Sequence, residues 1–591
     1  MSFYQPGIGF AYMKKLITRS FKSAILATAI TIAHPLGFAA ADLNQTVDQT
    51  GLSGSFLASR VAIDDNDDEA AVKFLEKATS LDGSNAKLNQ DYFAALVANG
   101  RIQDAANVAR DMEKLGPRKN LSGYVIAADE IRKRSWKKAA TALKDVAGVD
   151  LDKTLREIML AWINVGERDF EEAQTRVNDL TGPEWIAVMK NYHSGLIAAM
   201  SGDTDTAEAK LKAVIDNRAV ISVLTETYLR SIEAMTRTQS KAGKADKAKA
   251  TLDAGMAIFP SHPPFVAMKA KLEAGEVLQD LITNPQEGAA EIFYNLASAI
   301  ERDGVGAITK GYLQIANHLA PDSDVIKLGL AELYLRQGYY KRSNSFYSSV
   351  TGESSFDRIA RLEKATNLSR LDKKSEAIEE LRKLIDEDRK DLAGYMTLGS
   401  LFNREKRYRE GAEIFDAAVE SIGPAKRFHW NLFFRRGISY ERLKEWEKAE
   451  PNFVKALELS PNQPEVLNYL GYSWIDQGIN LEEGMEMIRK AVELRPRSGF
   501  IVDSLGWAHY RLGNYEEAVV QLERAVQLMP QDPTINDHLG DAYWKVGRRL
   551  EATFQWKIAL ATETEPENPE EIEKKLRTGL VDEAEAEAKA E

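Results

Sequence analysis

The sequence predicts an all-α protein built as a solenoid of helical hairpins. In the C-terminal third a glycine returns every 34 or 35 positions, at Gly437, Gly471, Gly506 and Gly540. Each glycine is followed 12 or 13 positions later by a second small residue: Ala449, Gly484, Ala518 and Ala552. A third small residue follows seven positions further on: Ala456, Ala491, Ala525 and Ala559. A period near 34 with two amphipathic halves is typical of stacked hairpins rather than of a closed globular domain.

The unit around Gly471 shows how each half forms. Apolar residues at helical spacing predict a first helix over 465–477, and Gly478 ends it. A second helix is expected over 481–494, and Pro496 marks the turn into the next unit, since proline cannot continue a helix interior. We place Gly471 where the two helices face each other, so that their backbones can approach closely.

These units resemble the tetratricopeptide repeat (TPR). The C-terminal unit carries the small and aromatic residues of that motif at Leu539, Gly540, Tyr543, Ala552, Trp556 and Ala559. The same register runs back through Gly399, Ala365, Ala331 and Ala297, and again through Gly195, Ala161 and Ala127. The resemblance covers roughly residues 50–562 and implies a right-handed superhelical solenoid of about 12–14 hairpins.

The repeat phase divides the chain. We expect a degenerate N-terminal arm over 42–262 and a C-terminal arm over 289–562. Between them the phase slips at 263–288, where Pro263 and Pro264 begin a short helix before Gly275 and Pro285. This segment is interpreted as a hinge or insertion, and a single irregular repeat is the alternative. Residues 563–591, with eleven acidic and four basic side chains, are expected to form an acidic tail, in which 570–580 can form a capping helix.

The first 41 residues resemble an export signal. Met13 is a candidate functional start, followed by the basic residues Lys14, Lys15, Arg19 and Lys22. The apolar run Ala24–Ala33 is too short to span a bilayer, and the alanines at 39–41 offer a cleavage site. We therefore expect a soluble periplasmic protein with no stable membrane span after cleavage; an uncleaved N-terminal anchor helix is the alternative. Since the chain has no cysteine, it cannot be a bacterial lipoprotein.

Composition argues against several function classes. The net charge is −12, and no basic block follows the first thirty residues, so no nucleic-acid partner is expected. No sequence motif of a hydrolase, metalloprotease or nucleotide-binding enzyme is present, and no segment outside the repeats is long enough for a catalytic domain. Histidines occur singly, without a second ligand one turn away. We predict a protein that is not an enzyme and has no catalytic residue, cofactor or metal.

In the TPR family the first helix of each hairpin lines the concave surface. Transferring the inward positions to this chain gives a predicted partner-binding set on the last three units: Asn468, Tyr472, Phe500, Asp503, Trp507, Tyr510, Asp537, Asp541 and Trp544. Aromatic side chains dominate interface energies, and the aspartates would favour a partner with lysine or arginine beside apolar residues. The alternative is that the aromatic residues pack between repeats.

The ending of the array, over 468–472, 503–514 and 538–547, resembles bacterial envelope TPR adaptors of carboxy-terminal processing proteases. The resemblance implies a scaffold that binds a protein or peptide partner, including a periplasmic protease to which it recruits substrates. This chain departs from the lipoprotein adaptors because it lacks the lipid-bearing cysteine. The alternative is a cytoplasmic or membrane-associated chaperone-like assembly factor with an uncleaved N-terminal helix. Exposed helical faces at the solenoid ends also allow a homo-oligomer.

Overall fold

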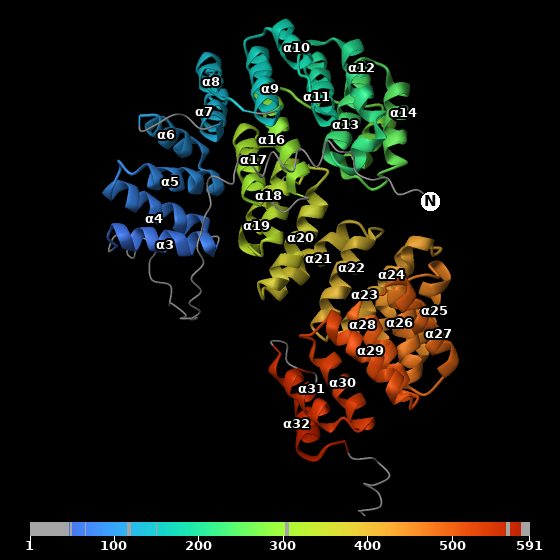
Figure 1. Cartoon of the computed structure of the whole chain (residues 1–591). Coiled ribbons are helices and arrows are strands. Elements are labelled where there is room, and N and C mark those ends of the chain that lie inside the picture. The colour runs from blue at the N-terminus through green and yellow to red at the C-terminus, as the bar shows by residue number, and fades with distance from the viewer. Residues whose placement is uncertain are drawn as a thin grey trace, which may run out of the picture. The chain divides into compact units, whose positions relative to one another are not determined.

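The computed structural model describes residue 47 and residues 50–580, except 66, 115–119, 149, 302–305, 351, 563–565 and 567. The predicted signal over 1–41 and the end of the acidic tail over 581–591 lie outside the described residues. Throughout the described part the chain forms 30 α-helices and no strand. It divides into two compact units, unit 1 up to Lys373 and unit 2 from Lys374 (Figure 1).

Unit 1 consists mainly of antiparallel helix pairs. The first six are α3/α4 (Leu52–Asp64, Asp68–Leu81), α5/α6 (Ala86–Asn99, Ile102–Met112), α7/α8 (Asn120–Arg132, Trp136–Leu143), α9/α10 (Asp150–Gly166, Phe170–Asn178), α11/α12 (Glu184–Ser201, Thr204–Ile215) and α13/α14 (Thr225–Lys241, Ala245–Met256). Two more follow, α16/α17 (Pro285–Glu301, Gly306–Leu319) and α18/α19 (Asp324–Arg336, Tyr340–Tyr347). The single helices are α15 (Pro263–Glu273) and α20 (Asp357–Arg370), and the short 3₁₀ helix η1 (Arg218–Ser222) precedes α13.

Unit 2 repeats the same hairpin with a more regular period. Its pairs are α22/α23 (Leu392–Arg404, Tyr408–Ser421), α24/α25 (Trp430–Arg442, Trp446–Leu459), α26/α27 (Pro464–Asp476, Leu481–Leu494), α28/α29 (Gly499–Arg511, Tyr515–Leu528) and α30/α31 (Pro533–Lys545, Arg549–Ala561). Helix α21 (Lys374–Glu387) precedes them, η2 (Arg427–His429) precedes α24, and α32 (Pro569–Thr578) follows. The predicted all-α solenoid of paired helices is therefore confirmed, with eight pairs in unit 1 and five in unit 2.

The hairpins form for local reasons that the sequence displays. Gly478, at φ +72°, ends α26 in the left-handed conformation that favours glycine, at the predicted break. At the start of α30 the Asp532 carboxylate accepts hydrogen bonds from the backbone N–H groups of Thr534 and Ile535, which caps the helix. No described helix is long and apolar enough to cross a membrane.

The concave side of the first six hairpins is filled by the chain itself. Helices α16 and α17 contact α5, α7, α9, α11 and α13, which are all first helices of successive hairpins (Figure 1). The contact is tight, because a Cβ atom added at Gly288 would lie 2.4 Å from the ring of Trp162. It is also polar in places, since the Lys310 Nζ atom lies 3.0 Å from the Asp68 carboxylate with both side chains largely buried. Helices α16 and α17 therefore occupy the space in front of α5, α7, α9, α11 and α13 in the described part of unit 1.

The segment predicted as a hinge, 263–288, lies inside unit 1. After α15 it runs without helix to Asn284, with Leu278 and Ile282 buried. The Leu278 N–H donates to the Ser240 hydroxyl on α13 at 3.0 Å. The division between the compact units lies instead at Lys373 and Lys374, because the segment and the hairpin after it pack against the N-terminal arm. Motion of 263–288 in solution stays a prediction.

Candidate binding surfaces

Helix α28 carries four of the predicted residues on one face. Phe500, Asp503, Trp507 and Tyr510 are spaced by three, four and three positions, which aligns them along a helix. The Trp507 and Tyr510 rings are stacked, with centroids 4.7 Å apart and planes at 11°. Both rings are partly exposed, and Phe500 is 60% exposed. The helix therefore presents three aromatic side chains that are at least partly exposed.

A buried charge pair supports these aromatic side chains from the next hairpin. His538 on α30 stacks on Trp507 with ring centroids 3.9 Å apart, and its Nδ1 atom lies 3.0 Å from the Asp503 carboxylate. Burial alone would lower the pKa of His538, but the charge of Asp503 and the hydrogen bond to it outweigh burial and raise that pKa. Asp503 therefore forms a contact between α28 and α30. It holds the His538 imidazole in place, and that ring stacks on Trp507.

Two further predicted residues come from α26. The Asn468 side-chain amide donates to the Ser504 hydroxyl at 3.1 Å. The buried Oδ1 atom of Asn468 has no hydrogen-bond partner among the described residues. Tyr472 is partly exposed, and burial followed by the charges of Asp476 and Asp503 raises its pKa. We call Tyr472, Phe500, Trp507 and Tyr510 the aromatic surface. It brings together residues from two successive hairpins.

The remaining three predicted residues lie beneath the chain's own last helix. Lys575 on α32 donates to the Asp537 carboxylate at 2.9 Å and to Asp541 at 2.8 Å. Asp541 also accepts a hydrogen bond from the Trp556 indole, and burial followed by the charge of Asp537 raises its pKa against the opposing effect of Lys575.

Trp544 is held at the same end of unit 2. Its ring packs on Trp556 at 5.5 Å, and a Cβ atom added at Gly579 would lie 2.0 Å from it. The capping helix expected over 570–580 is therefore present as α32, and it covers the C-terminal third of the predicted set. Binding of a partner by Asp537, Asp541 and Trp544 stays a prediction, and it would require α32 to move.

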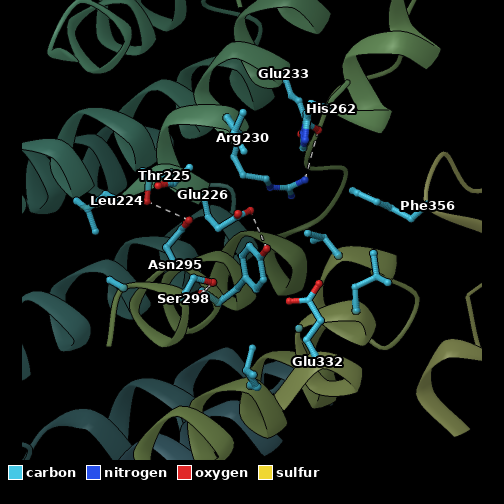
Figure 2. A pocket seen from close by; sticks show the side chains of 18 of the residues that line it. Leu224, Thr225, Glu226, Arg230, Glu233, His262, Asn295, Ser298, Glu332 and Phe356 are labelled. Carbon is cyan, nitrogen blue, oxygen red and sulfur yellow. Dashed lines mark hydrogen bonds and ion pairs between the residues drawn. The ribbon is translucent and has the colours of Figure 1, made fainter. Parts of the chain in front are cut away.

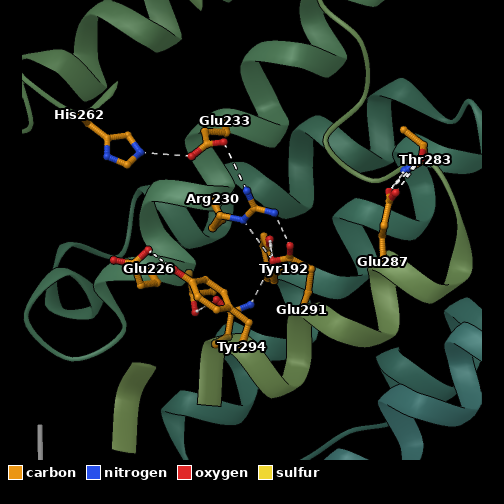
Figure 3. Close-up of polar contacts among 11 residues, drawn as sticks. Tyr192, Glu226, Arg230, Glu233, His262, Thr283, Glu287, Glu291 and Tyr294 are labelled. Atoms are coloured by element: carbon orange, nitrogen blue, oxygen red, sulfur yellow. Dashed lines mark hydrogen bonds and ion pairs between the residues drawn. The ribbon is translucent and has the colours of Figure 1, made fainter. Parts of the chain in front are cut away.

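Unit 1 contains a buried polar network that the sequence analysis missed. Arg230 on α13 forms ion pairs with Glu291 on α16 and, at 3.5 Å, with Glu233 on its own helix (Figure 3). The Tyr192 hydroxyl donates to Glu291 at 2.6 Å, and the His262 imidazole lies 3.2 Å from Glu233. No local motif could reveal this network, because its members come from four separate segments of the chain.

The charged groups of this network stabilise one another in their ionised forms. Burial alone would raise the pKa of Glu233, but the hydrogen bond from His262 and the charge of Arg230 outweigh it and lower that pKa. Burial alone would lower the pKa of Arg230, but the charges of Glu291 and Glu233 outweigh burial and raise that pKa well above its usual value. The described residues contain no group of three or more histidines or carboxylates that could hold a metal ion.

Comparison with known proteins identifies the repeats. Residues 506–547 match a model described as TPR repeat, residues 430–463 one described as tetratricopeptide repeat, and residues 307–354 one described as YpiA-like tetratricopeptide repeats. The chain therefore contains tetratricopeptide repeats in both units. A TPR repeat-containing protein of Pseudomonas aeruginosa is 32% identical over 83 residues, which is 14% of each chain. The BBSome complex member BBS4 of Bos taurus is 30% identical over 104 residues, or 17% of this chain and 19% of that protein.

Solved structures resemble the chain only weakly. A tetratricopeptide repeat protein from Parabacteroides merdae is 14% identical, with a TM-score of 0.37, over 43% of this chain and 98% of its own. The APC/C hetero-tetramer Cut9–Hcn1 gives the same identity and TM-score over 91% of this chain and 98% of that one. With sequence identity and TM-scores this low, these structures do not indicate where the chain binds a partner. Tetratricopeptide repeats favour a role in protein–protein interaction.

Proposed function

We propose that this TPR chain is an exported, non-catalytic adaptor of the bacterial cell envelope, which recruits protein substrates to a periplasmic carboxy-terminal processing protease. The observation that carries the proposal is the aromatic surface on α26 and α28, which is partly exposed and fixed from behind by His538. Large rigid rings supply contact area at a small entropic cost, which suits them to bind a protein partner. The export signal and the resemblance of the array's ending to envelope adaptors support the location and the class of partner.

The internal pairing of the aspartates changes what the partner should look like. Asp503 contacts His538, and Asp537 and Asp541 contact Lys575, so none of the three is left as a free acid for a basic partner. The exposed acid near the surface, Asp476, pairs with Arg511 at 2.9 Å. The proposed contact therefore rests on the aromatic surface, and we expect apolar and aromatic side chains of the partner to fill it.

A pull-down from envelope extract tests the proposal. The full chain is compared with a Phe500→Ala/Trp507→Ala/Tyr510→Ala variant and with Phe428→Ala, which removes a ring that is 66% exposed outside the aromatic surface. We expect a carboxy-terminal processing protease to co-purify with the wild type and with Phe428→Ala, and to be lost with the triple variant. Circular dichroism shows whether the triple variant keeps its helix content. Retention of the protease by a folded triple variant would exclude the aromatic surface as the binding site.

The proposed location has its own test. The mass of the mature N-terminus and fractionation of cells distinguish a cleaved periplasmic protein from the alternative, an assembly factor that keeps its N-terminal helix. A mature chain that begins near residue 40–42 supports export, whereas an intact chain in the cytoplasmic or membrane fraction supports the alternative. Light scattering of the purified protein tests the predicted self-association.

A further inference from the structure

A cleft of about 350 Å³ opens in unit 1, away from the aromatic surface. Its walls come from the start of α13, the start of α15, the middle of α16, α18 and the start of α20 (Figure 2). This volume lies at the small end of ligand pockets, which span roughly 300–1,000 Å³, and so suits one or two side chains rather than a folded domain.

Two carboxylates from different helices line the cleft: Glu226, and Glu332, whose one ion pair among the described residues is long. Glu226 on α13 accepts a hydrogen bond from the Tyr294 hydroxyl at 2.9 Å and forms no ion pair with a described residue. Glu332 on α18 accepts no hydrogen bond from the described residues, and its nearest cation is Arg336, one turn along the same helix, at 3.9 Å. Its side chain is 53% exposed. Figure 2 shows both carboxylates directed into the same space.

The arginine that lines the cleft cannot neutralise these acids. Arg230 is buried and already shared between Glu291 and Glu233, and His262 supplies a second partner to Glu233 (Figure 3). Arg230 is therefore occupied by its own two partners, so that Glu226 has no ion pair among the described residues and Glu332 has only its long contact with Arg336. A further carboxylate, Glu363 on α20, adds negative charge near Glu332.

An apolar wall faces the acids. Phe356 lies at one side of the cleft, and Ile359, on α20, is 39% exposed there. Leu328 and Val325 on α18 also line the cleft. An exposed isoleucine beside two carboxylates that have few partners within the chain matches a side chain with an apolar stem and a cationic end, because such a chain can satisfy both surfaces at once.

We propose that this cleft binds a lysine or arginine side chain of a partner protein, with its cationic head between Glu226 and Glu332 and its alkyl stem on Phe356 and Ile359. The charge complementarity and the mixed lining carry this assignment. It is independent of the proposed adaptor function, since none of its residues belongs to the aromatic surface.

Glu332 is harder to ionise than a carboxyl group in water. Limited hydration in the cleft, then the charges of Glu226 and Glu363, raise the pKa of Glu332 to about 7. A bound cation would stabilise the ionised form and release a proton where Glu332 is still protonated. Removal of either neighbouring acid would weaken this repulsion and lower the pKa of Glu332 part of the way.

Fluorescence anisotropy with a defined peptide tests the site. The probe is the fluorescein-labelled peptide Gly-Ala-Leu-Lys-Leu-Ala-Gly-amide, and its twin carries glutamine in place of lysine. Full-length wild-type protein is expected to bind the lysine peptide at least about tenfold more tightly than the twin, because a charge-assisted contact is stronger than a neutral one. Glu226→Gln/Glu332→Gln should abolish that preference, and Ile359→Asn should weaken binding of both peptides.

The matched control is Glu171→Gln, which removes one exposed acid on α10 that does not line the cleft. It should keep the preference for the lysine peptide. Competition by spermidine at equal concentration distinguishes a side-chain site from one that takes free polyamines, and the proposal requires the peptide to bind more tightly than spermidine. Equal binding of the two peptides by wild type, or an unchanged preference in a folded Glu226→Gln/Glu332→Gln variant, would overturn it.

Discussion

Gly471 and Gly484 lie against each other across the α26/α27 hairpin, each where a side chain would strike the other's backbone. A Cβ atom added at Gly471 would lie 2.6 Å from the Gly484 carbonyl oxygen, and one added at Gly484 would lie 2.9 Å from the Gly471 carbonyl oxygen. Because the obstructing atoms belong to the backbone, no rotamer change can relieve either contact. The close approach expected at Gly471 is therefore present.

Substitution of Gly471 should accordingly destabilise unit 2. We expect Gly471→Ala to lower the free energy of unfolding by about 1–3 kcal/mol, because the hairpin must open. Gly54→Ala on α3 is the control, since the nearest atom to the added methyl group would be a Thr50 carbon at 3.6 Å and the change should be neutral or stabilising by about 0.5–1 kcal/mol. Urea unfolding followed by circular dichroism measures both; equal effects would refute the close-packing argument.

The Asp503–His538 pair makes the stability of unit 2 depend on pH. Since the folded pKa of His538 is raised, the pair stabilises the fold fully below the unfolded histidine pKa of about 6.5, and this contribution is lost as pH rises through the folded pKa. Asp503→Asn should lower the pKa of His538 by about 1–3 units and flatten this dependence.

An NMR titration of the His538 ring, with thermal unfolding at pH 5 and pH 8, measures both effects. Asp476→Asn is the control, because Asp476 pairs with Arg511 and does not contact His538. The control should leave the His538 titration unchanged. A His538 pKa that stays the same in Asp503→Asn would show that another charge governs the imidazole.

The repeat spacing made the hairpins predictable, but it did not reveal the ion pairs between side chains of successive repeats. Asp503 and His538 are 35 positions apart, and Asp541 and Lys575 are 34 apart, so each pair joins equivalent regions of successive units. An inward-facing position in one repeat also faces the next repeat. The aspartates were predicted to meet a partner because each unit was taken separately. The signal that could have shown their true partners was an acid and a base one repeat apart.

The contacts that shape unit 1 were harder to predict. Lys310 pairs with Asp68 across 242 positions, and Gln286 donates to the Ile131 carbonyl across 155. Local periodicity fixes which residues form a helix, but not which distant helix fills a concave face. The cleft was missed for the same reason, since its lining residues come from helices that are far apart in the sequence, with Glu226 on α13 and Glu332 on α18.

Lys575 should hold the C-terminal helix in place. In Lys575→Met the buried Asp541 loses its cation beside Asp537, and breaking such a buried pair costs about 3–5 kcal/mol. We expect α32 to detach rather than the unit to unfold, with faster hydrogen exchange over 569–578 and a red-shifted emission from Trp544. Lys574→Met is the matched control, because the neighbouring Lys574 is exposed. Undiminished protection of α32 in Lys575→Met would show that Ile572 and its apolar contacts suffice.

Packing of α16 into the N-terminal arm should depend on the absence of a side chain at Gly288. A methyl group there would meet three ring atoms of Trp162 at 2.4 Å, and this fully buried indole cannot turn freely because it donates to His193 at 3.1 Å. We expect Gly288→Ala to destabilise unit 1 by about 1–3 kcal/mol through this overpacking.

Gly306→Ala, at the start of α17, provides the comparison, since its nearest neighbour would be the Gln337 amide nitrogen at 3.5 Å. Hydrogen exchange across α9 and α16 separates local loosening from global unfolding, and Gly288→Ala should accelerate exchange in both helices while Gly306→Ala should not. If the two variants exchange alike, Trp162 can be displaced at little cost, and the filled concave face of unit 1 is held by its polar contacts, such as Lys310 with Asp68, rather than by close packing.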